Sequence, residues 1–173
     1  TIPVIQDTRT LEYDITSLIK KMTRPKTPVI AVLQGHNEPS MEEKLGKLNT
    51  LLSQMYTVKP LTLAGKDTVD DDVDALFVVG PQGDLGPNEL KAVDQFLMKG
   101  KSVAFFVDGM VIEAPQGMQM PGMDQPKVGR GNDTNLQDLF EKYGVKLHDD
   151  IILDKQNVIG LVPANGRMLP TNY

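Results

Sequence analysis

The chain has 173 residues, and its 18 basic and 23 acidic side chains give a net charge of −5. This length suits one domain of ordinary size, or one domain with a small appendage, and allows a core without cross-links. The acidic excess argues against nucleic acid and anionic membrane surfaces as partners, because both are bound by clustered Lys and Arg. The absence of Cys excludes disulfides, thiolate metal sites and a cysteine nucleophile. No apolar run reaches the ~18 residues of a membrane span.

A helix is expected over residues 8–23, where the apolar residues recur at helical spacing and share one face. These residues are Leu11, Ile15, Leu18, Ile19 and Met22. Pro25 and Pro28 end the helix, so residues 1–27 form a helical lead-in. The continuous apolar run over residues 29–33 is typical of a strand that is buried on both faces.

The middle of the chain predicts a helix between two further strands. Ser40 and Glu43 have capping-box spacing, so a helix is expected to begin at Ser40. Its buried stripe consists of Met41, Leu45, Leu48, Leu52 and Met55. Residues 56–63 alternate as a strand near the sheet edge, and residues 75–79 predict a strand buried on both faces.

The remaining elements follow from capping and periodicity. Pro87 suits the first turn of a helix that Gly100 ends, and a strand is expected over residues 102–107. Thr134 with Gln137 predicts a helix over residues 134–143, which Gly144 ends. Short strands are expected near residues 145–147, 150–154 and 158–162.

This order of elements predicts a single α/β domain over residues 1–173. Right-handed crossovers lead to a three-layer sandwich with a mainly parallel sheet, of flavodoxin-like or class I glutamine amidotransferase-like type. Residues 109–131 do not fit this pattern, since they hold five Gly, three Pro and four Met with no period. A long loop is predicted there, and such loops are often functional.

Candidate ligand-binding residues follow the predicted strands, because open parallel sheets bind ligands beyond the carboxyl ends of their strands. They are His36, Asn37, Glu38, Gln82 and Asp108. His36, Glu38 and Asp108 could converge there as acid, base and orienting carboxylate. The alternative is that Gly and Pro shape tight turns while the polar side chains satisfy exposed backbone groups.

Other motifs argue against several kinds of chemistry. No G-x-S-x-G elbow, P-loop or G-x-G-x-x-G turn is present, so neither a catalytic residue nor a cofactor is predicted. The acidic segment 67–74 lacks the order of an EF-hand loop and predicts a solvated turn rather than a metal site. Four methionines in the long loop could bind Cu(I), but adaptable contacts with a protein partner are the better interpretation. They are Met110, Met118, Met120 and Met123.

Several phrases in order resemble the substrate-binding-like auxiliary domain of ABC transporters, the group that includes gliding-motility auxiliary components. The phrases are residues 2–6, 11–17, 20–24, 35–39, 74–81, 90–101, 133–139 and 143–145. In that family the turn after the first strand is usually Gly-His-Gly-Glu, whereas this sequence has Asn37 in place of the second Gly. The departure calls a strict backbone role for the turn into question.

The resemblance implies an extracytoplasmic (periplasmic) domain that is tethered by membrane helices outside this sequence and works beside an ABC permease and ATPase. It brings no catalytic residues. Because the sequence opens at Thr1, we expect it to be a piece of a longer protein. The leading hypothesis is a non-enzymatic accessory domain that acts through protein contacts. The alternatives are a module for a small ligand such as a saccharide or peptide, and a hydrolase with Glu38 or Asp108 as general base.

Overall fold

The computed structural model describes residues 11–113, 128–150, 159–164 and 167–172. Contacts divide the chain into two compact units. One comprises Thr1–Asp108 with Asn132–Leu147, and the other comprises Gly109–Gly131 with His148–Tyr173. The first unit holds the main sheet and its helices, and the second holds two antiparallel strand pairs.

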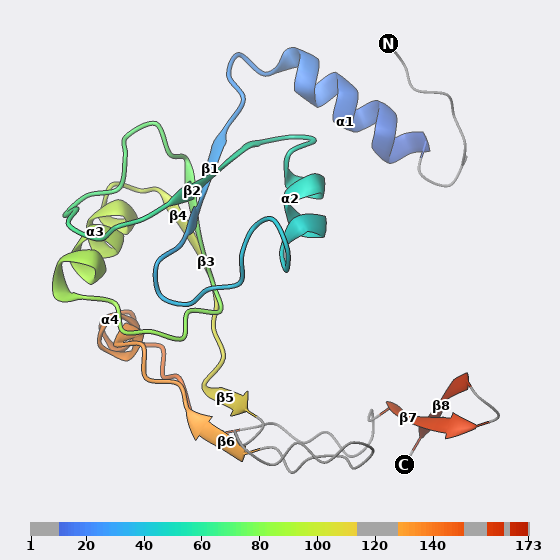
Figure 1. Cartoon of the computed structure of the whole chain (residues 1–173). Helices are drawn as coiled ribbons and strands as arrows, with labels where there is room; N and C mark the ends of the chain where they lie inside the picture. The colour runs from blue at the N-terminus through green and yellow to red at the C-terminus, as the bar shows by residue number, and fades with distance from the viewer. Residues whose placement is uncertain (1–10, 114–127, 151–158, 165–166, 173) are drawn as a thin grey trace. The chain divides into compact units, whose positions relative to one another are not determined.

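The main sheet has four parallel strands in the order β2-β1-β3-β4, as Figure 1 shows. They are β1 (Val29–Leu33), β2 (Thr57–Leu61), β3 (Ala75–Val79) and β4 (Ser102–Phe106). All five residues of β1 are buried, as expected for an apolar central strand. The predictions of a mainly parallel sheet and of an edge position for the second strand are confirmed.

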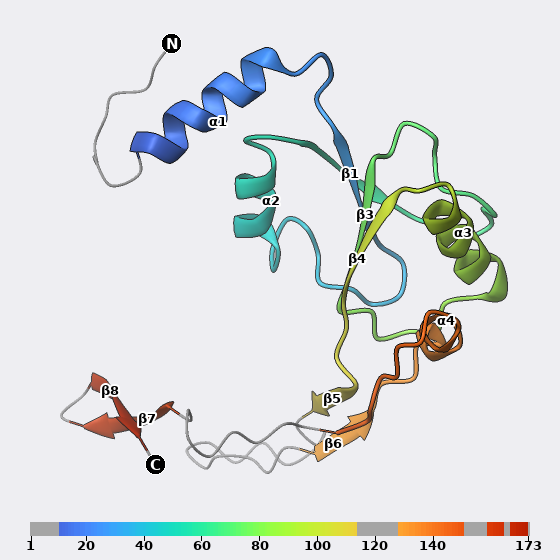
Figure 2. The ribbon, with the colours of Figure 1, turned by 180° about the vertical axis from the view of Figure 1, so that it is seen from behind.

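Helices cover the two faces of this sheet unequally. The short α2 (Gly46–Leu52) lies on one face, whereas α3 (Pro87–Met98) and α4 (Leu136–Lys142) lie on the other, as both views show (Figures 1 and 2). The predicted three-layer α/β architecture is therefore confirmed. An additional helix, α1 (Leu11–Thr23), precedes the sheet and has no buried residue.

The hydrophobic core lies between the sheet and the helices α3 and α4. Leu76 and Val78 of β3 pack there with apolar residues of both helices, and Phe105 meets Phe140 edge-to-face with ring centroids 4.9 Å apart. The other residues of β3 are only half-buried, so the prediction of a strand buried on both faces is wrong. The reason is that α2 has only seven residues and contacts β2, at the far edge of the sheet.

Two predicted helix starts are wrong. Ser40 Oγ does accept the Glu43 N–H at 3.2 Å, but residues 41–44 form a turn and α2 begins only at Gly46. The helix α4 begins at Leu136 rather than Thr134, because Asn135 has a left-handed φ of 58° and ends the preceding segment. The expected helix ends are confirmed: Gly100 and Gly144 have positive φ values just beyond α3 and α4.

The second unit corrects the prediction of a long loop over residues 109–131. Its two ends form the antiparallel strands β5 (Met110–Glu113) and β6 (Val128–Gly131). The sequence concealed β6 because two of its four residues are Gly, which weakens a strand signal. Residues 114–127 lie outside the described residues.

The C-terminal segment forms the antiparallel pair β7 (Ile159–Ala164) and β8 (Arg167–Asn172). The predicted strand near 158–162 corresponds to β7, whereas β8 was not predicted. Residues 145–147 are not a strand, and residues 151–154 of another predicted strand lie outside the described residues. Within the described part of the chain, no helix is long and apolar enough to cross a membrane.

Candidate functional site

A buried cluster of charged side chains lies where β1 ends. His36 is buried, and its Nδ1 lies 3.1 Å from Glu38 Oε1. Its Nε2 lies 3.0 Å from Glu89 Oε2, on the first turn of α3. We call His36, Glu38 and Glu89 the strand-end triad. It joins the loop after β1 to a helix more than fifty residues away in sequence.

The electrostatics of the triad favour a protonated imidazole. Burial is the largest single influence and lowers the pKa of His36, but hydrogen bonds with Glu89 and Glu38 and the charges of both carboxylates raise it. The net effect raises the pKa of His36 above its ordinary value of 6.5. An imidazolium donates from both ring nitrogens, so both carboxylates receive a charge-assisted hydrogen bond. Neither nitrogen is then available as a general base.

Backbone N–H groups hold the two carboxylates of the triad in place. Glu38 Oε2 accepts the N–H groups of Gly35 at 2.9 Å and His36 at 2.6 Å, and its side chain is only 1% exposed. Glu89 Oε2 accepts the Gly86 N–H at 2.7 Å and so caps α3. Each carboxylate therefore serves its own loop or helix end as well as His36.

The loops after β1 and β3 are also joined by their backbones. The carbonyl of His36 accepts the N–H groups of Gln82 at 2.8 Å and Gly83 at 3.0 Å. A Cβ on Gly83 would lie 3.4 Å from the His36 Cα, at the short end of ordinary van der Waals contact, so the two loops pack closely here. Asn37 has a φ of 60°, a conformation that Asn tolerates better than other non-glycine residues. The turn thus keeps a glycine-like backbone despite its departure from Gly-His-Gly-Glu.

The predicted ligand-binding residues separate into two groups. His36 and Glu38 are paired within the triad, whereas Asn37, Gln82 and Asp108 are exposed. Asp108 is not the carboxylate that orients His36, because Glu38 and Glu89 occupy both ring nitrogens. The Asp108 backbone carbonyl instead accepts the side-chain amide of Asn132 at 2.9 Å.

Sequence reasoning missed Glu89 as a member of this site. Its only signal was an acidic residue in the first turn of a predicted helix, which capping explains by itself.

Among the predicted partner-binding methionines, Met110 lies in β5 and is half-buried. Met118, Met120 and Met123 lie outside the described residues, so their role stays a prediction.

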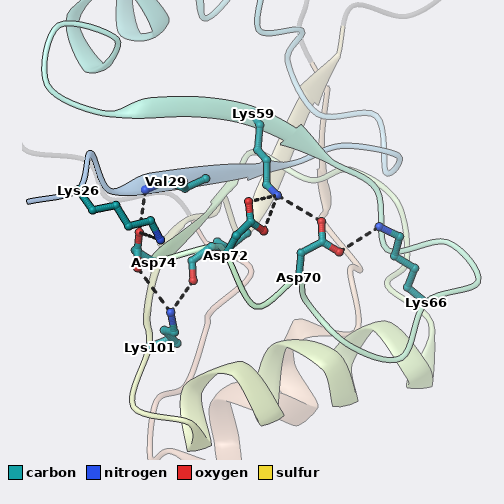
Figure 3. Close-up of polar contacts among 9 residues, drawn as sticks. Lys26, Val29, Lys59, Lys66, Asp70, Asp72, Asp74 and Lys101 are labelled. Carbon is teal, nitrogen blue, oxygen red and sulfur yellow. Dashed lines mark hydrogen bonds and ion pairs between the residues drawn. The ribbon is translucent and has the colours of Figure 1, made fainter.

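A second charged cluster lies at the opposite end of the sheet, where the strands begin (Figure 3). Lys59 Nζ lies 2.9 Å from Asp72 and 3.3 Å from Asp70, and Lys66 also pairs with Asp70. Lys99 pairs with Asp71, while Lys26 and Lys101 pair with Asp74. We call these pairs the Asp–Lys network. Its aspartates have lysine partners, and within the described ranges no three His, Asp or Glu residues are grouped to hold a metal ion.

One carboxylate of the network has a further backbone role. Asp74 Oδ2 accepts the Val29 N–H at 2.8 Å, at the first residue of β1. This hydrogen bond, followed by the charges of Lys26 and Lys101, lowers the pKa of Asp74 below 3.8. Asp70 likewise has a lowered pKa, mainly because Lys59 and Lys66 donate to it.

Comparison of the sequence with known proteins relates the chain to a transport family. Residues 27–169 match the family model described as an ABC-type uncharacterized transport system. The chain is also similar to an uncharacterized protein of Borreliella burgdorferi, with 25% identity over 159 residues. That alignment covers 90% of the chain but only 29% of the relative, so the chain spans less than a third of that protein's length. No solved structure matches the chain.

Proposed function

We propose a function that starts from family membership: the chain belongs to the family described as an ABC-type uncharacterized transport system. Its role is associated with transport. Within that role, we infer that it is a non-enzymatic accessory domain that acts through contacts with other proteins. The observation that carries this proposal is the state of His36, whose two ring nitrogens are both engaged by carboxylates.

A catalytic role for the residues at the strand ends would require a free acid or base. A general base must reach the proton of a substrate, and a buried group that is fully hydrogen-bonded inside the protein is poorly placed to do so. His36 and Glu38 instead fix the loop after β1 against α3. The triad thus supports a structural role for His36 and Glu38, which the sequence had suggested as an acid and a base.

The proposed setting follows the family resemblance in finer detail than the family match. We place the domain on the extracytoplasmic side of the cytoplasmic membrane, anchored by segments outside this sequence. Its partners are the permease and ATPase of an ABC-type system of the gliding-motility kind. The exposed polar loops after β1, β3 and β4 support a contact role, because rigid scaffolds commonly present their binding residues on loops.

Affinity purification tests this proposal. The protein is tagged in its native membranes, solubilised in mild detergent and purified, with an unrelated tagged membrane protein as control. Specific recovery of a permease and an ATPase is the expected result. Recovery of the protein alone, from membranes in which the transporter itself stays assembled, would contradict the accessory role.

A small-ligand module is the second candidate, and the exposure of Asn37, Gln82 and Asp108 favours it. A ligand that binds only the folded state raises the melting temperature. Saccharides and short peptides are screened for such a rise, which Gln82→Ala and Asp108→Asn should abolish. Asp84→Asn, an exposed change in the same region, is the matched control. A screen without any shift would remove this candidate.

A further inference from the structure

One half of the main sheet presents apolar side chains that no helix of the described chain covers well. Alternate residues of β3 and β4 point away from the core, on the face that carries α2. We call Phe77, Val79, Ala104 and Phe106 the open face. Phe77 and Phe106 pack ring against ring with centroids 5.8 Å apart, yet Phe106 is 55% exposed. Parallel sheets are normally covered on both faces, and among the described residues nothing covers this one fully.

The same chain carries a helix with an apolar face that the described residues leave unburied. One side of α1 carries an apolar stripe, and none of its residues is buried. The stripe consists of Leu11, Ile15, Leu18, Ile19 and Met22. Ile19 is 57% exposed and Met22 is 84% exposed. An isolated helix of this length is marginal in water, so it gains most of its stability by packing its apolar face.

The charges at the two ends of α1 determine in which direction this helix would fit on an open face. The first turn of α1 is acidic, with Glu12 and Asp14, whereas its last turn is basic, with Lys20 and Lys21. At the carboxyl end of β4, Val107 packs against the core, so the exposed Asp108 lies on the same side of the strand as Phe106. Complementary charges meet when α1 runs parallel to β4, with its basic end near Asp108.

The connector between α1 and β1 opposes this direction within one chain. Its residues 24–28 are attached where the strands begin. The Arg24 guanidinium lies 5.7 Å from the Tyr56 ring centroid, Lys26 lies 3.9 Å from Asp74, and the Pro28 carbonyl accepts the Thr57 N–H at 3.0 Å. The basic end of α1 is therefore held at the amino end of its own sheet. Docked on its own open face, α1 would place its acidic end near Asp108.

We propose that α1 of one copy packs its apolar stripe on the open face of a second copy, parallel to β4, and that the exchange is reciprocal. A two-fold arrangement uses the same two surfaces in both copies and leaves neither unpaired. It also doubles the buried area, which brings two helix-sized contacts toward the ~1,600 Å² of a standard stable interface. This assembly does not depend on the transporter contacts proposed above.

Cysteine cross-linking tests the arrangement cleanly, because the chain contains no Cys. A tagged chain with Ile19→Cys is co-expressed with an untagged chain that carries Phe106→Cys. The parallel direction predicts a disulfide-linked heterodimer. Ser17→Cys, which lies on the opposite side of α1 from Ile19, is the matched control and should not cross-link. Failure of Ile19→Cys to cross-link at a level above this control would overturn the proposal.

A second variant distinguishes docking within one chain. Leu11→Cys and Phe106→Cys in the same chain would close an intramolecular disulfide if α1 lay antiparallel on its own sheet. Formation of that disulfide in a monomer would overturn the exchange between copies. Under the proposal, the Leu11→Cys/Phe106→Cys chain stays reduced.

The oligomeric state gives an independent measurement. Sedimentation of the full 173-residue chain should show a dimer, and Ile19→Glu or Phe106→Glu should weaken dimerisation about tenfold or more. Met98→Glu, at an exposed apolar side chain outside both surfaces, should leave the dimer intact. Circular dichroism checks that each variant stays folded. A wild-type chain that sediments as a monomer at all accessible concentrations would contradict the proposal.

Discussion

The two ends of the parallel sheet both carry clusters of opposite charges, yet the clusters differ in burial. In the strand-end triad, the side chains of Glu38 and Glu89 are 1% and 13% exposed. In the Asp–Lys network, Asp71 is 94% exposed, and the other aspartates are open to water as well. Breaking a buried charge pair by removing one partner typically costs about 3–5 kcal/mol, whereas an exposed pair contributes about 0–1 kcal/mol.

This difference explains why a count of charges in the sequence does not identify the site. The Asp–Lys network contains more ionisable groups than the triad, but its ion pairs are exposed to solvent. The triad has three groups, and each is hydrogen-bonded to another element or to the backbone of its own loop. Burial and backbone contacts therefore decide which cluster holds the fold together.

The largest expected effect is that of Glu38→Ala. The change removes the acceptor of two backbone N–H groups and leaves buried His36 with one carboxylate. We expect the free energy of unfolding to fall by about 3–5 kcal/mol, measured by urea denaturation. Glu42→Ala, at an exposed residue in the following turn, is the control. A loss below about 1 kcal/mol would place Glu38 among ordinary surface residues.

At the opposite end, Asp74→Ala tests the one carboxylate of the network with a backbone role. It leaves the N–H of Val29, at the start of a buried strand, without its side-chain acceptor. The expected loss of stability is about 1–2 kcal/mol. Asp72→Ala, which breaks only a pair with Lys59, should cost less. Equal losses in the two variants would show that the backbone hydrogen bond adds nothing.

Titration should separate the two ends of the sheet. The pKa of His36 is raised above 6.5 in the folded state, so its stabilising contribution is fully present below pH 6.5 and is lost as pH rises through the folded pKa. The pKa values of Asp70 and Asp74 are lowered below 3.8. Their contributions are present above pH 3.8 and are lost only as pH falls through the folded pKa values.

The measurement is the free energy of unfolding from pH 5 to 9 for wild type and His36→Gln. The wild-type advantage over the variant should shrink as the pH rises above about 6.5. A difference that stays constant over this range would show that the charge of His36 does not contribute.

The smallest effect is expected for Asp71→Asn, which breaks the exposed pair with Lys99. Because both partners are solvated, stability should change by no more than about 0.5 kcal/mol. Raising the salt concentration should reduce even this difference, since salt screens exposed charges. A loss of more than 1 kcal/mol would erase the contrast between the two ends.

The main sheet could be predicted well from the sequence because its strands are short apolar runs with clear boundaries. The runs over residues 29–33 and 75–79 are strands with those same bounds. The helix at Pro87 also carries its own signals, from a proline in the first turn to Gly100 beyond the end. These features are local, so they can be read along the chain.

The errors arose where the decisive contact is distant. The pairing of β5 with β6 depends on a partner strand, and the half-burial of β3 depends on how far α2 extends. The site was predicted in part: the turn with His36 and Glu38 was singled out, but Glu89 joins it only through the fold. Asp108 was chosen for its place after a strand, and position alone did not bring it into contact with His36.

The most direct test of the triad as one structural unit is a double-mutant cycle between the loop and the helix. Stability is measured for wild type, His36→Ala, Glu89→Ala and the double variant, with the Asp71–Lys99 pair as the exposed comparison. The account predicts a coupling of about 1.5–3 kcal/mol for His36 and Glu89, and less than about 1 kcal/mol for the exposed pair. If the stability losses of His36→Ala and Glu89→Ala add to that of the double variant within about 0.5 kcal/mol, the two side chains are not coupled. That result would contradict the account of the triad as one structural unit.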